Sequence, residues 1–413
     1  MLSPPLPVEI WRQIFRVATY VPLIFDSEWN YPPHERLWEG WQSMDDTEIQ
    51  TKRTIIQVCR LWKEIGSEVL FQAIRILEHE FDRVERLIEI LQRSALVSEH
   101  GYGWWTKRIE CHIREFSTEN TEKLALLLEC CHHIQIISVT SAAGYKGPIL
   151  AHLNRAIGSR FTHSLRRLDF ILDEYHMNAS ITADLVESLP NVRLTSLSLM
   201  WGDSFQFQSL PPAFTDVTVL TLQFHVLAGQ VSCEWHFPNL RSLALTNAKH
   251  SGLRMLKPFI ERHHSTLVYL HLQITSSVIT VLPSIMKNLP HLTTLTFDDV
   301  DICNLGGSIT DHADLLFIIR GLEYLGIINI GADDDGPVNT QHGLKLILEH
   351  GVLPDLKVVR LLRENIRAVS SSENGLDWSK VVKLCEHYRI RLENMDGKPM
   401  TNVSDLAVVK SEE

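Results

Sequence analysis

The stretch Leu240-Arg241-Ser242-Leu243-Ala244-Leu245 decides the fold of this 413-residue chain, because its apolar pattern returns along most of the sequence. The last two apolar residues are two apart, so they face the same side of a β-strand. One such strand cannot bury its apolar side alone, and stacked copies are needed to build a continuous core. Clear copies begin, at intervals of 23 to 34 residues, at Leu165, Leu194, Val217, Leu240, Leu267, Leu292, Leu322 and Leu356, and weaker copies contain Ile109 and Ile134.

A repeat with this period and core resembles the leucine-rich repeat. The resemblance implies an α/β solenoid, a horseshoe with a parallel sheet. Helices are expected between the copies, over 121–131, 181–189, 253–264, 277–289, 312–321 and 342–350. Steps such as Leu289-Pro290-His291 end a helix and start the next strand. The asparagine or cysteine expected three residues after each strand is missing from all eight clear copies, so an irregular solenoid is expected. The alternative is a doubly wound α/β domain, which needs longer and more fully apolar strands.

A different pattern occupies the N-terminus. Leu6-Pro7-Val8-Glu9-Ile10 starts an expected helix, in which Ile14 shares a stripe with Ile10. A second helix is expected over roughly 54–68, with Val58, Cys59 and Trp62 on its apolar face. Residues 69–76 are more strand-like. Helices this short need a partner face to be stable.

In order and spacing these segments resemble the F-box, a helical module that docks proteins onto cullin-type ubiquitin ligases. The resemblance implies binding of a Skp-type adaptor, and of the cullin through it. The residues that match the contacting positions are Leu6, Pro7, Ile10, Ile14, Val58, Cys59 and Trp62. An insertion at about 20–52, rich in Trp and Pro, separates the two halves, as in F-boxes of gilled mushrooms and related fungi. The alternative is a small helical cap without a docking role.

The expected organisation has four parts. Residues 1–77 form an F-box-like helical module with the insertion at about 20–52. Residues 78–104 form a linker, with one amphipathic helix over 78–98. Residues 105–393 form the leucine-rich-repeat-like solenoid, and residues 394–413 form a disordered tail, because they are polar and short of apolar residues.

The concave sheet face of such a solenoid is expected to be exposed and to hold an unknown target protein or peptide. Its residues alternate with the buried ones along each strand. Tyrosine and arginine often anchor protein interfaces. The candidate target-binding residues are Arg167, Asp169, Tyr269, His271, Gln273, Asp298, Tyr324 and Arg360.

Composition excludes several other classes of protein. The formal net charge of −11 argues against a nucleic-acid or anionic-membrane binder. Seven irregularly spaced cysteines argue against a disulfide framework, and no window of 18 apolar residues occurs. We therefore expect an intracellular protein, cytoplasmic or nuclear. His263-His264 ends an expected helix, where favourable placement near the helix dipole explains the pair.

No motif for catalysis, for a cofactor or for a metal stands out. Cys130-Cys131-His132-His133 has the composition of a metal site, but four adjacent residues cannot all point at one ion. The sequence therefore predicts a non-catalytic, substrate-recognition subunit of an SCF-type ubiquitin ligase. The alternative is a repeat scaffold that does not engage a ligase, and an enzyme is a distant third.

Overall fold

The computed structural model describes residues 6–20, 40–113, 117–141, 156–157, 161, 163–172, 189, 192–201, 214–224, 236–248, 257–274, 289–298, 320–328, 336–349, 352–361, 378–394 and 398–400. The chain divides into two compact units, Met1–Val219 and Leu220–Glu413. Each unit is described by itself below.

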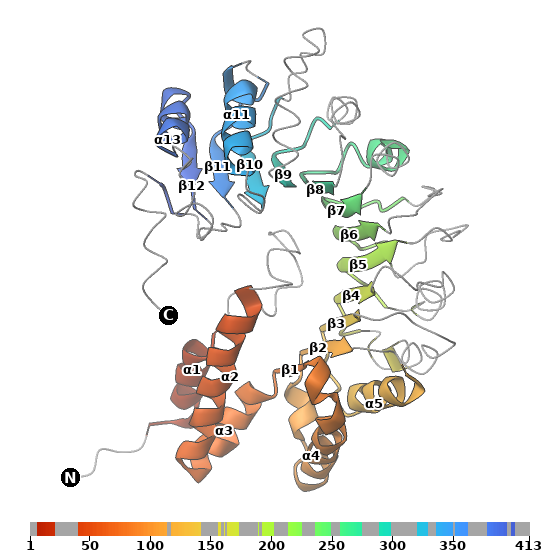
Figure 1. The fold of residues 1–413 in the computed structure, drawn as a ribbon. Helices are drawn as coiled ribbons and strands as arrows, with labels where there is room; N and C mark the ends of the chain where they lie inside the picture. Colours follow the sequence, from red (N-terminus) through yellow and green to blue (C-terminus); the bar gives the residue numbers. More distant parts are fainter. Residues whose placement is uncertain are drawn as a thin grey trace, which may run out of the picture. The chain divides into compact units, whose positions relative to one another are not determined.

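Twelve strands form the sheet, and their order in it is their order in the sequence. Figure 1 shows them following one another along the chain. They are β1 Ala73–Ile76, β2 Arg108–Ile113, β3 Ile136–Ser141, β4 Arg167–Leu172, β5 Ser196–Trp201, β6 Val219–Phe224, β7 Ser242–Ala248, β8 Tyr269–Ile274, β9 Thr294–Asp298, β10 Tyr324–Ile328, β11 Val358–Leu361 and β12 Arg391–Glu393. A sequential parallel order is that of an α/β solenoid. It excludes the doubly wound alternative, in which the strand order reverses at a switch point.

In the first unit, one apolar residue of each strand lies in register with the next. This column runs through Ile74, Ile109, Ile137, Leu168 and Leu197, and all five side chains are buried. The predicted strands are thereby confirmed, including the two weak copies. The sheet begins earlier than expected, because β1 lies within residues assigned to the helical module and pairs with β2.

The second unit repeats the arrangement. The strands that the sequence predicts, from β7 to β11, are present. β12 extends the sheet beyond the last predicted copy, because Leu392 continues the apolar column opposite Val359. The column consists of Leu243, Leu270, Leu295, Leu325, Val359 and Leu392.

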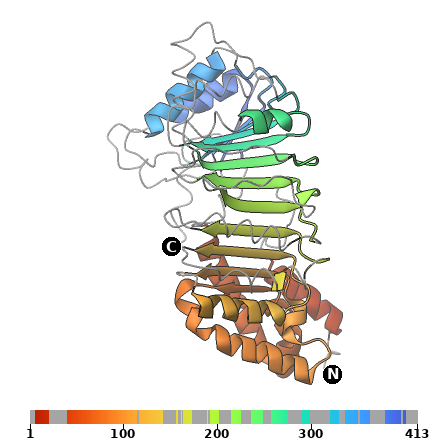
Figure 2. The same cartoon turned by 90° about the vertical axis from the view of Figure 1, so that its right-hand side faces the viewer.

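Two helices accompany the first strands, α4 (Val84–Val97) and α5 (Thr118–Glu129). Figures 1 and 2 show them side by side, and the Lys123 ammonium on α5 lies 3.1 Å from a Glu85 carboxylate oxygen on α4. The single helix expected over 78–98 is wrong in its first six residues, which form the 3-10 helix η2 (Glu78–Arg83). A second 3-10 helix, η3, covers Tyr102–Trp105. The Ser117 side chain caps α5 by accepting a hydrogen bond from the Asn120 amide at 3.1 Å.

In the second unit, α11 (Gly336–Glu349) covers the helix predicted over 342–350 and begins six residues earlier. The helix α13 (Trp378–His387) was not predicted. Residues 257–262 are helical, within the helix expected over 253–264. The expected helices over 277–289 and 312–321 fall almost entirely outside the described residues, as does the one over 181–189.

The expected disorder beyond residue 394 does not hold at residues 398–400. Pro399 forms an antiparallel bridge with Glu393, and Met400 is buried. The Met400 amide donates to the Leu392 carbonyl at 2.9 Å. Apolar burial of one methionine and this hydrogen bond therefore hold residues 398–400 against β12.

The N-terminal helices are α1 (Val8–Ala18), α2 (Gly40–Val58) and α3 (Arg60–Leu70). A single helix over 54–68 is wrong, because the chain leaves the helical conformation at Cys59, with φ −161° and ψ 172°. Cys59 is the N-cap of α3, and its Sγ accepts a hydrogen bond from the Trp62 amide at 3.5 Å. α2 also reaches back to Gly40, so the last part of the insertion is helical.

Candidate functional site

Helix α1 carries two apolar stripes on different sides. Phe15 is buried in a core with Ile55, Ile65 and Val69. Val8 and Trp11 pack against the same core from α1, and Trp62 packs against it from α3. This stripe is what holds α1 to the other N-terminal helices.

Three aromatic rings join α1 to α3. The ring centroids of Trp11 and Trp62 are 4.8 Å apart. Those of Phe15 and Trp62 are 5.0 Å apart in an edge-to-face arrangement, a favourable geometry for aromatic pairs. The sequence predicted that Trp62 contacts a partner. In the structure its ring packs mainly between α1 and α3.

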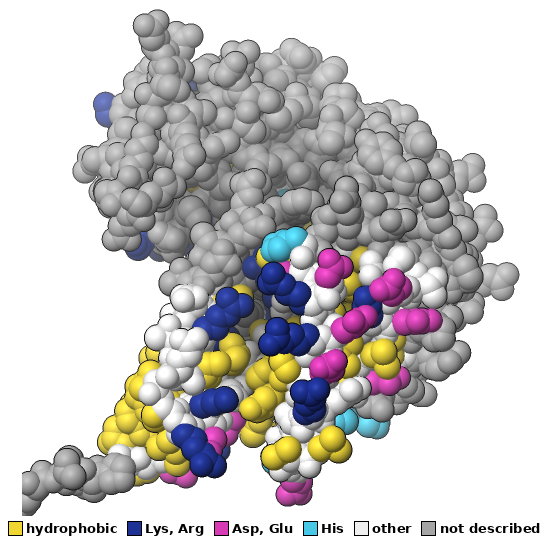
Figure 3. Space-filling view, turned by 60° about the horizontal axis from the view of Figure 1, so that its bottom comes forward, with side chains coloured by type: hydrophobic (Ala, Val, Ile, Leu, Met, Phe, Trp, Pro, Cys, Tyr) yellow, Lys and Arg dark blue, Asp and Glu magenta, His cyan; other side chains and the backbone are white. Residues whose placement is uncertain are grey.

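The second stripe of α1 faces outward. Ile10, Ile14 and Val17 are 40%, 42% and 78% exposed, although their spacing of four and three residues places them on one side of the helix. Leu6 before α1, and Val58 and Leu61 where α2 meets α3, are exposed as well. We call these six residues the N-terminal apolar surface. Figure 3 shows hydrophobic side chains exposed over the N-terminal helices, with Lys and Arg side chains beside them.

Four of the seven predicted adaptor contacts belong to this surface: Leu6, Ile10, Ile14 and Val58. Pro7 is exposed and forms the N-cap of α1, and its carbonyl accepts hydrogen bonds from the amides of Ile10 and Trp11. Cys59 is exposed. Sequence reasoning missed Val17 and Leu61, although Val17 follows Ile14 at helical spacing. That these residues contact an adaptor remains a prediction.

An ion pair links α1 and α3 a short way from the aromatic rings. The Arg12 guanidinium donates to the Glu68 carboxylate through Nε, at 3.0 and 3.2 Å, and through Nη2, at 2.7 Å. The Glu68 side chain is 14% exposed and that of Arg12 is 39% exposed. The hydrogen bond to Glu68 raises the pKa of Arg12 above its ordinary value.

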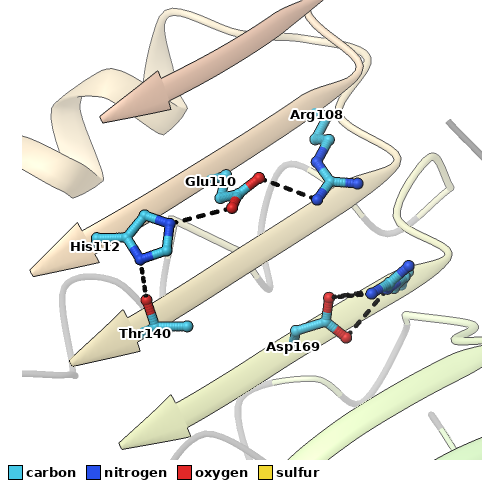
Figure 4. A network of polar contacts seen from close by, with 6 residues as sticks. Arg108, Glu110, His112, Thr140 and Asp169 are labelled. Carbon is cyan, nitrogen blue, oxygen red and sulfur yellow. Dashed lines mark hydrogen bonds and ion pairs between the residues drawn. The ribbon is translucent and has the colours of Figure 1, made fainter. Parts of the chain in front are cut away.

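The sheet of the first unit carries a charged network on the face opposite the apolar column, which we call the polar face (Figure 4). On β2, Arg108 Nη2 donates to Glu110 at 3.0 Å, and the other Glu110 oxygen lies 3.1 Å from His112 Nε2. His112 Nδ1 lies 2.7 Å from the Thr140 hydroxyl on β3. On β4, Arg167 Nε donates to both oxygens of Asp169, at 3.1 and 2.8 Å.

Burial sets the electrostatics of this network. Desolvation lowers the pKa of Arg108, and the nearby charge of Glu110 opposes the effect. For Glu110, desolvation acts to raise the pKa, but the hydrogen bond with His112 and the charge of Arg108 outweigh it and lower the pKa to about 2. Glu110 is therefore ionised and held by its neighbours at neutral pH.

The prediction that the target-binding face is exposed is wrong for three of its residues. Arg167 and Asp169 are each 1% exposed, and His271 is fully buried. An arginine and a carboxylate two residues apart on one strand point to the same face and form an ion pair, which offsets part of the cost of burying both charges. The sequence shows the pairing, as Arg-x-Glu at Arg108 and Arg391 and Arg-x-Asp at Arg167, but not the burial, since the Arg391 side chain is 59% exposed.

The other predicted target contacts lie in the second unit. The Tyr269 hydroxyl lies 3.1 Å from the Thr296 hydroxyl. The Arg360 guanidinium lies 5.4 Å from the centre of the Tyr324 ring and 2.6 Å from Glu393. Tyr269, Tyr324 and Arg360 are partly exposed. Gln273 is on β8 and Asp298 on β9, and their side chains fall outside those described. Target binding by these residues remains a prediction.

The remaining chemistry-bearing residues form no centre in the part of the chain that the structure describes. No group of three or more His, Cys, Asp or Glu side chains there could hold a metal ion. Cys131 is buried, which raises the pKa of its thiol to about 12, and the ring of His133 meets Trp104 edge-on at 4.1 Å. None of the described helices has the length and apolar character needed to cross a bilayer.

His263 has a role different from the one predicted. It is buried, and desolvation lowers its pKa to about 4, so it is neutral and gains nothing from a helix dipole. Its Nε2 accepts a hydrogen bond from the Phe237 amide at 2.9 Å, and Nδ1 donates to the Phe259 carbonyl at 2.7 Å. Its exposed neighbour His264 contacts the Glu261 carbonyl at 2.8 Å, as expected for a residue that ends a helix.

Comparison with known proteins assigns no family. No protein-family model matches the chain, and no curated protein sequence matches it. A solved structure with some similarity is a chain of the yeast structure titled "Crystal structure of Rad7 and Elc1 complex in yeast". The TM-score is 0.35 and the identity 13%, over 81% of this chain and 96% of that chain. A likeness at this level gives this chain no family, partner or activity.

Proposed function

We propose that this chain is a non-catalytic, substrate-recognition subunit of an SCF-type ubiquitin ligase. The N-terminal apolar surface docks a Skp-type adaptor, and through it the cullin. The partly exposed residues Tyr269, Tyr324 and Arg360 on the strands of the second unit hold the target protein. Ubiquitin transfer is then accelerated by proximity, because one assembly holds the target beside the charged enzyme.

The outward stripe of α1 is the observation that carries this proposal. The fold already uses Val8, Trp11 and Phe15 to attach α1, so it does not need Ile10, Ile14 and Val17 for its own core. Full burial of an aliphatic side chain is worth roughly 1.5–3 kcal/mol. Exposed apolar residues that line up on one side of a helix are typical of a protein-binding surface.

Capture of a purified Skp-type adaptor by the full chain tests the proposal. The variant Ile14→Asp places a charge in the outward stripe without touching the core, and we expect capture to be lost. The matched control is Leu126→Asp on α5, since Leu126 is 46% exposed on another helix of the same unit. The control is expected to capture the adaptor as the wild type does.

Trp62→Ala is a less direct test than its sequence position suggested. Because Trp62 packs on Trp11 and Phe15, its removal disturbs the attachment of α1 and lowers capture indirectly.

The second candidate function is a repeat scaffold that engages no ligase. It is favoured if the wild-type chain captures no adaptor although it is folded by circular dichroism.

A further inference from the structure

The N-terminal apolar surface is made from two segments that are far apart in the sequence. Ile10 and Ile14 come from α1, and Val58 and Leu61 come from the junction of α2 and α3. Bringing together two segments that are far apart in the sequence costs conformational entropy, which the contacts between them have to offset. The relative placement of the two segments therefore depends on what joins α1 to α3.

Besides the apolar core in which Phe15 meets Ile65 and Val69, two side-chain contacts join them at different points along α3. One is the contact of Trp62 with Trp11 and Phe15. The other is the ion pair between Arg12 and Glu68. Trp62 and Glu68 are six residues apart, which is about 9 Å along a helix. Apolar packing has no preferred direction and leaves a helix able to shift against its neighbour, whereas a forked ion pair is directional and restricts that shift.

The position of Arg12 on α1 gives the ion pair a further consequence. Residues two apart on a helix are rotated by about 200°, so Arg12 lies on the side opposite both Ile10 and Ile14. Fixing the Arg12 side to α3 turns the stripe of Ile10 and Ile14 outward. The fork of three hydrogen bonds to a largely buried carboxylate restricts rotation of α1 more than a single exposed contact does.

We propose that Arg12 and Glu68 are positioning residues for partner binding: the pair fixes the rotation of α1 on α3, so that both segments of the N-terminal apolar surface are preformed before the partner arrives. Neither residue contacts the partner in this scheme. The inference rests on the proposed docking of a Skp-type adaptor. The ion pair acts on the fraction of chains in which α1 has the rotation that binds the adaptor. As that fraction falls, the measured dissociation constant rises.

The experiment is a charge-swap cycle on the full chain, with the affinity for a purified Skp-type adaptor measured by titration calorimetry. We expect Arg12→Glu and Glu68→Arg each to weaken binding about 5- to 20-fold, and the double variant to return to within about threefold of the wild type. Arg12→Lys, which keeps the charge but loses the fork, is expected to be intermediate. The control is Arg93→Glu, which breaks the exposed Arg93–Glu89 pair within α4. Its affinity for the adaptor is expected to equal that of the wild type.

The outcomes separate this inference from the proposed function. Rescue by the double variant, with circular dichroism unchanged, supports a positioning role, since a general loss of stability is not restored by swapping two charges. Wild-type binding that neither single variant weakens overturns the inference and leaves adaptor docking intact. Weakened single variants without rescue by the swap overturn it too. A wild-type chain that binds no adaptor overturns both proposals. If the charge reversals fail to fold, Arg12→Lys and Glu68→Gln decide, and wild-type affinity in both overturns the inference.

Discussion

At the scale of single residues, Arg108 and Glu110 show why the polar face differs from the sequence prediction. Both side chains are buried on one face of β2, and their opposite charges form an ion pair. The sequence places them on the correct face, because residues two apart on a strand point the same way. It did not indicate that they are covered, since burial depends on the residues that the rest of the chain brings to that face.

Replacing Glu110 tests this burial through pH. The pKa of Glu110 in the folded chain is about 2, below its ordinary value of 4.5. The ionised carboxylate therefore stabilises the fold above about pH 4.5, and this contribution is lost as the pH falls through 2. We expect Glu110→Gln to lower the free energy of unfolding by about 3 kcal/mol at pH 7, and by clearly less at pH 3, measured by urea unfolding.

Glu119→Gln is the matched control, because Glu119 is exposed on α5 and pairs with Lys123. Little change is expected in it at either pH. A loss in Glu110→Gln that is the same at pH 7 and pH 3 would contradict the assignment of a lowered pKa to Glu110.

Gly103 tests close packing at a second position. A Cβ atom at Gly103 would lie 1.9 Å from the carbonyl oxygen of Cys130, a backbone atom that cannot move aside cheaply. We expect Gly103→Ala to lower the thermal midpoint of unfolding and to reduce the free energy of unfolding by about 1–3 kcal/mol or more. In Gly66→Ala the nearest atoms are methyl groups of Ile55 and Ile56, so a smaller loss is expected. Equal midpoints for Gly103→Ala and the wild type would show that the backbone yields.

At the scale of elements, the helices were predicted less well than the strands. The strands repeat, so each copy supports the assignment of the others, and every clear copy forms a strand. The boundary between α2 and α3 had no such support. Val58, Cys59 and Trp62 fit one helical face in the sequence, yet the chain is extended at Cys59 and a new helix begins. Local apolar spacing does not distinguish a continuous helix from two helices that meet at a cap.

His263 joins the helical residues 257–262 to the segment that leads into β7, and its replacement tests that connection. Burial lowers the pKa of His263 to about 4, with the charges of His236 and Arg262 acting in the same direction. The unfolded chain therefore binds a proton on this residue near pH 6.5 while the folded chain does not. Stability is full above about pH 6.5 and falls as the pH drops toward 4.

We expect the wild type to lose about 2 kcal/mol between pH 7.5 and pH 5 from this group alone, a loss that His263→Leu does not show. The variant is expected to be less stable at pH 7.5 by about 1–3 kcal/mol, because the buried Phe237 amide loses its acceptor. The difference between the two denaturation curves at each pH isolates the histidine. His264→Leu, at the exposed neighbour, should keep the pH dependence of the wild type. A parallel pH dependence in His263→Leu and the wild type would disprove the role of His263.

At the scale of the whole molecule, a stack of repeats depends on how its last strand is closed. β12 covers the edge of β11, and residues 398–400 in turn pair with β12. Glu393 binds Arg360 on β11 and Arg391 on its own strand. An open edge of a sheet exposes unpaired backbone groups to other chains.

A chain that ends at Tyr388 removes β12 and tests this closure. We expect a lower thermal midpoint and concentration-dependent aggregation, because Val359 loses its neighbour Leu392 and the β11 edge is uncovered. A chain that ends at Met400 keeps every described residue and is expected to unfold as the full chain does. The same midpoint for the two truncated chains would mean that β12 adds nothing to the second unit.

The sequence by itself determined the strands up to β11, their sequential order and the apolar columns. Apolar residues that alternate along each strand give it one apolar face, and the strands can bury that face only by stacking on their neighbours. It also placed Ile10 and Ile14 on one side of a helix. Only the tertiary structure decided which apolar residues are buried in the core and which stay exposed. Trp62 turned inward onto Trp11 and Phe15, Val17 stayed outside, and Arg167 and His271 were buried. The physical reason is that periodicity fixes the side of an element on which a residue lies, whereas burial depends on what distant segments pack against that side.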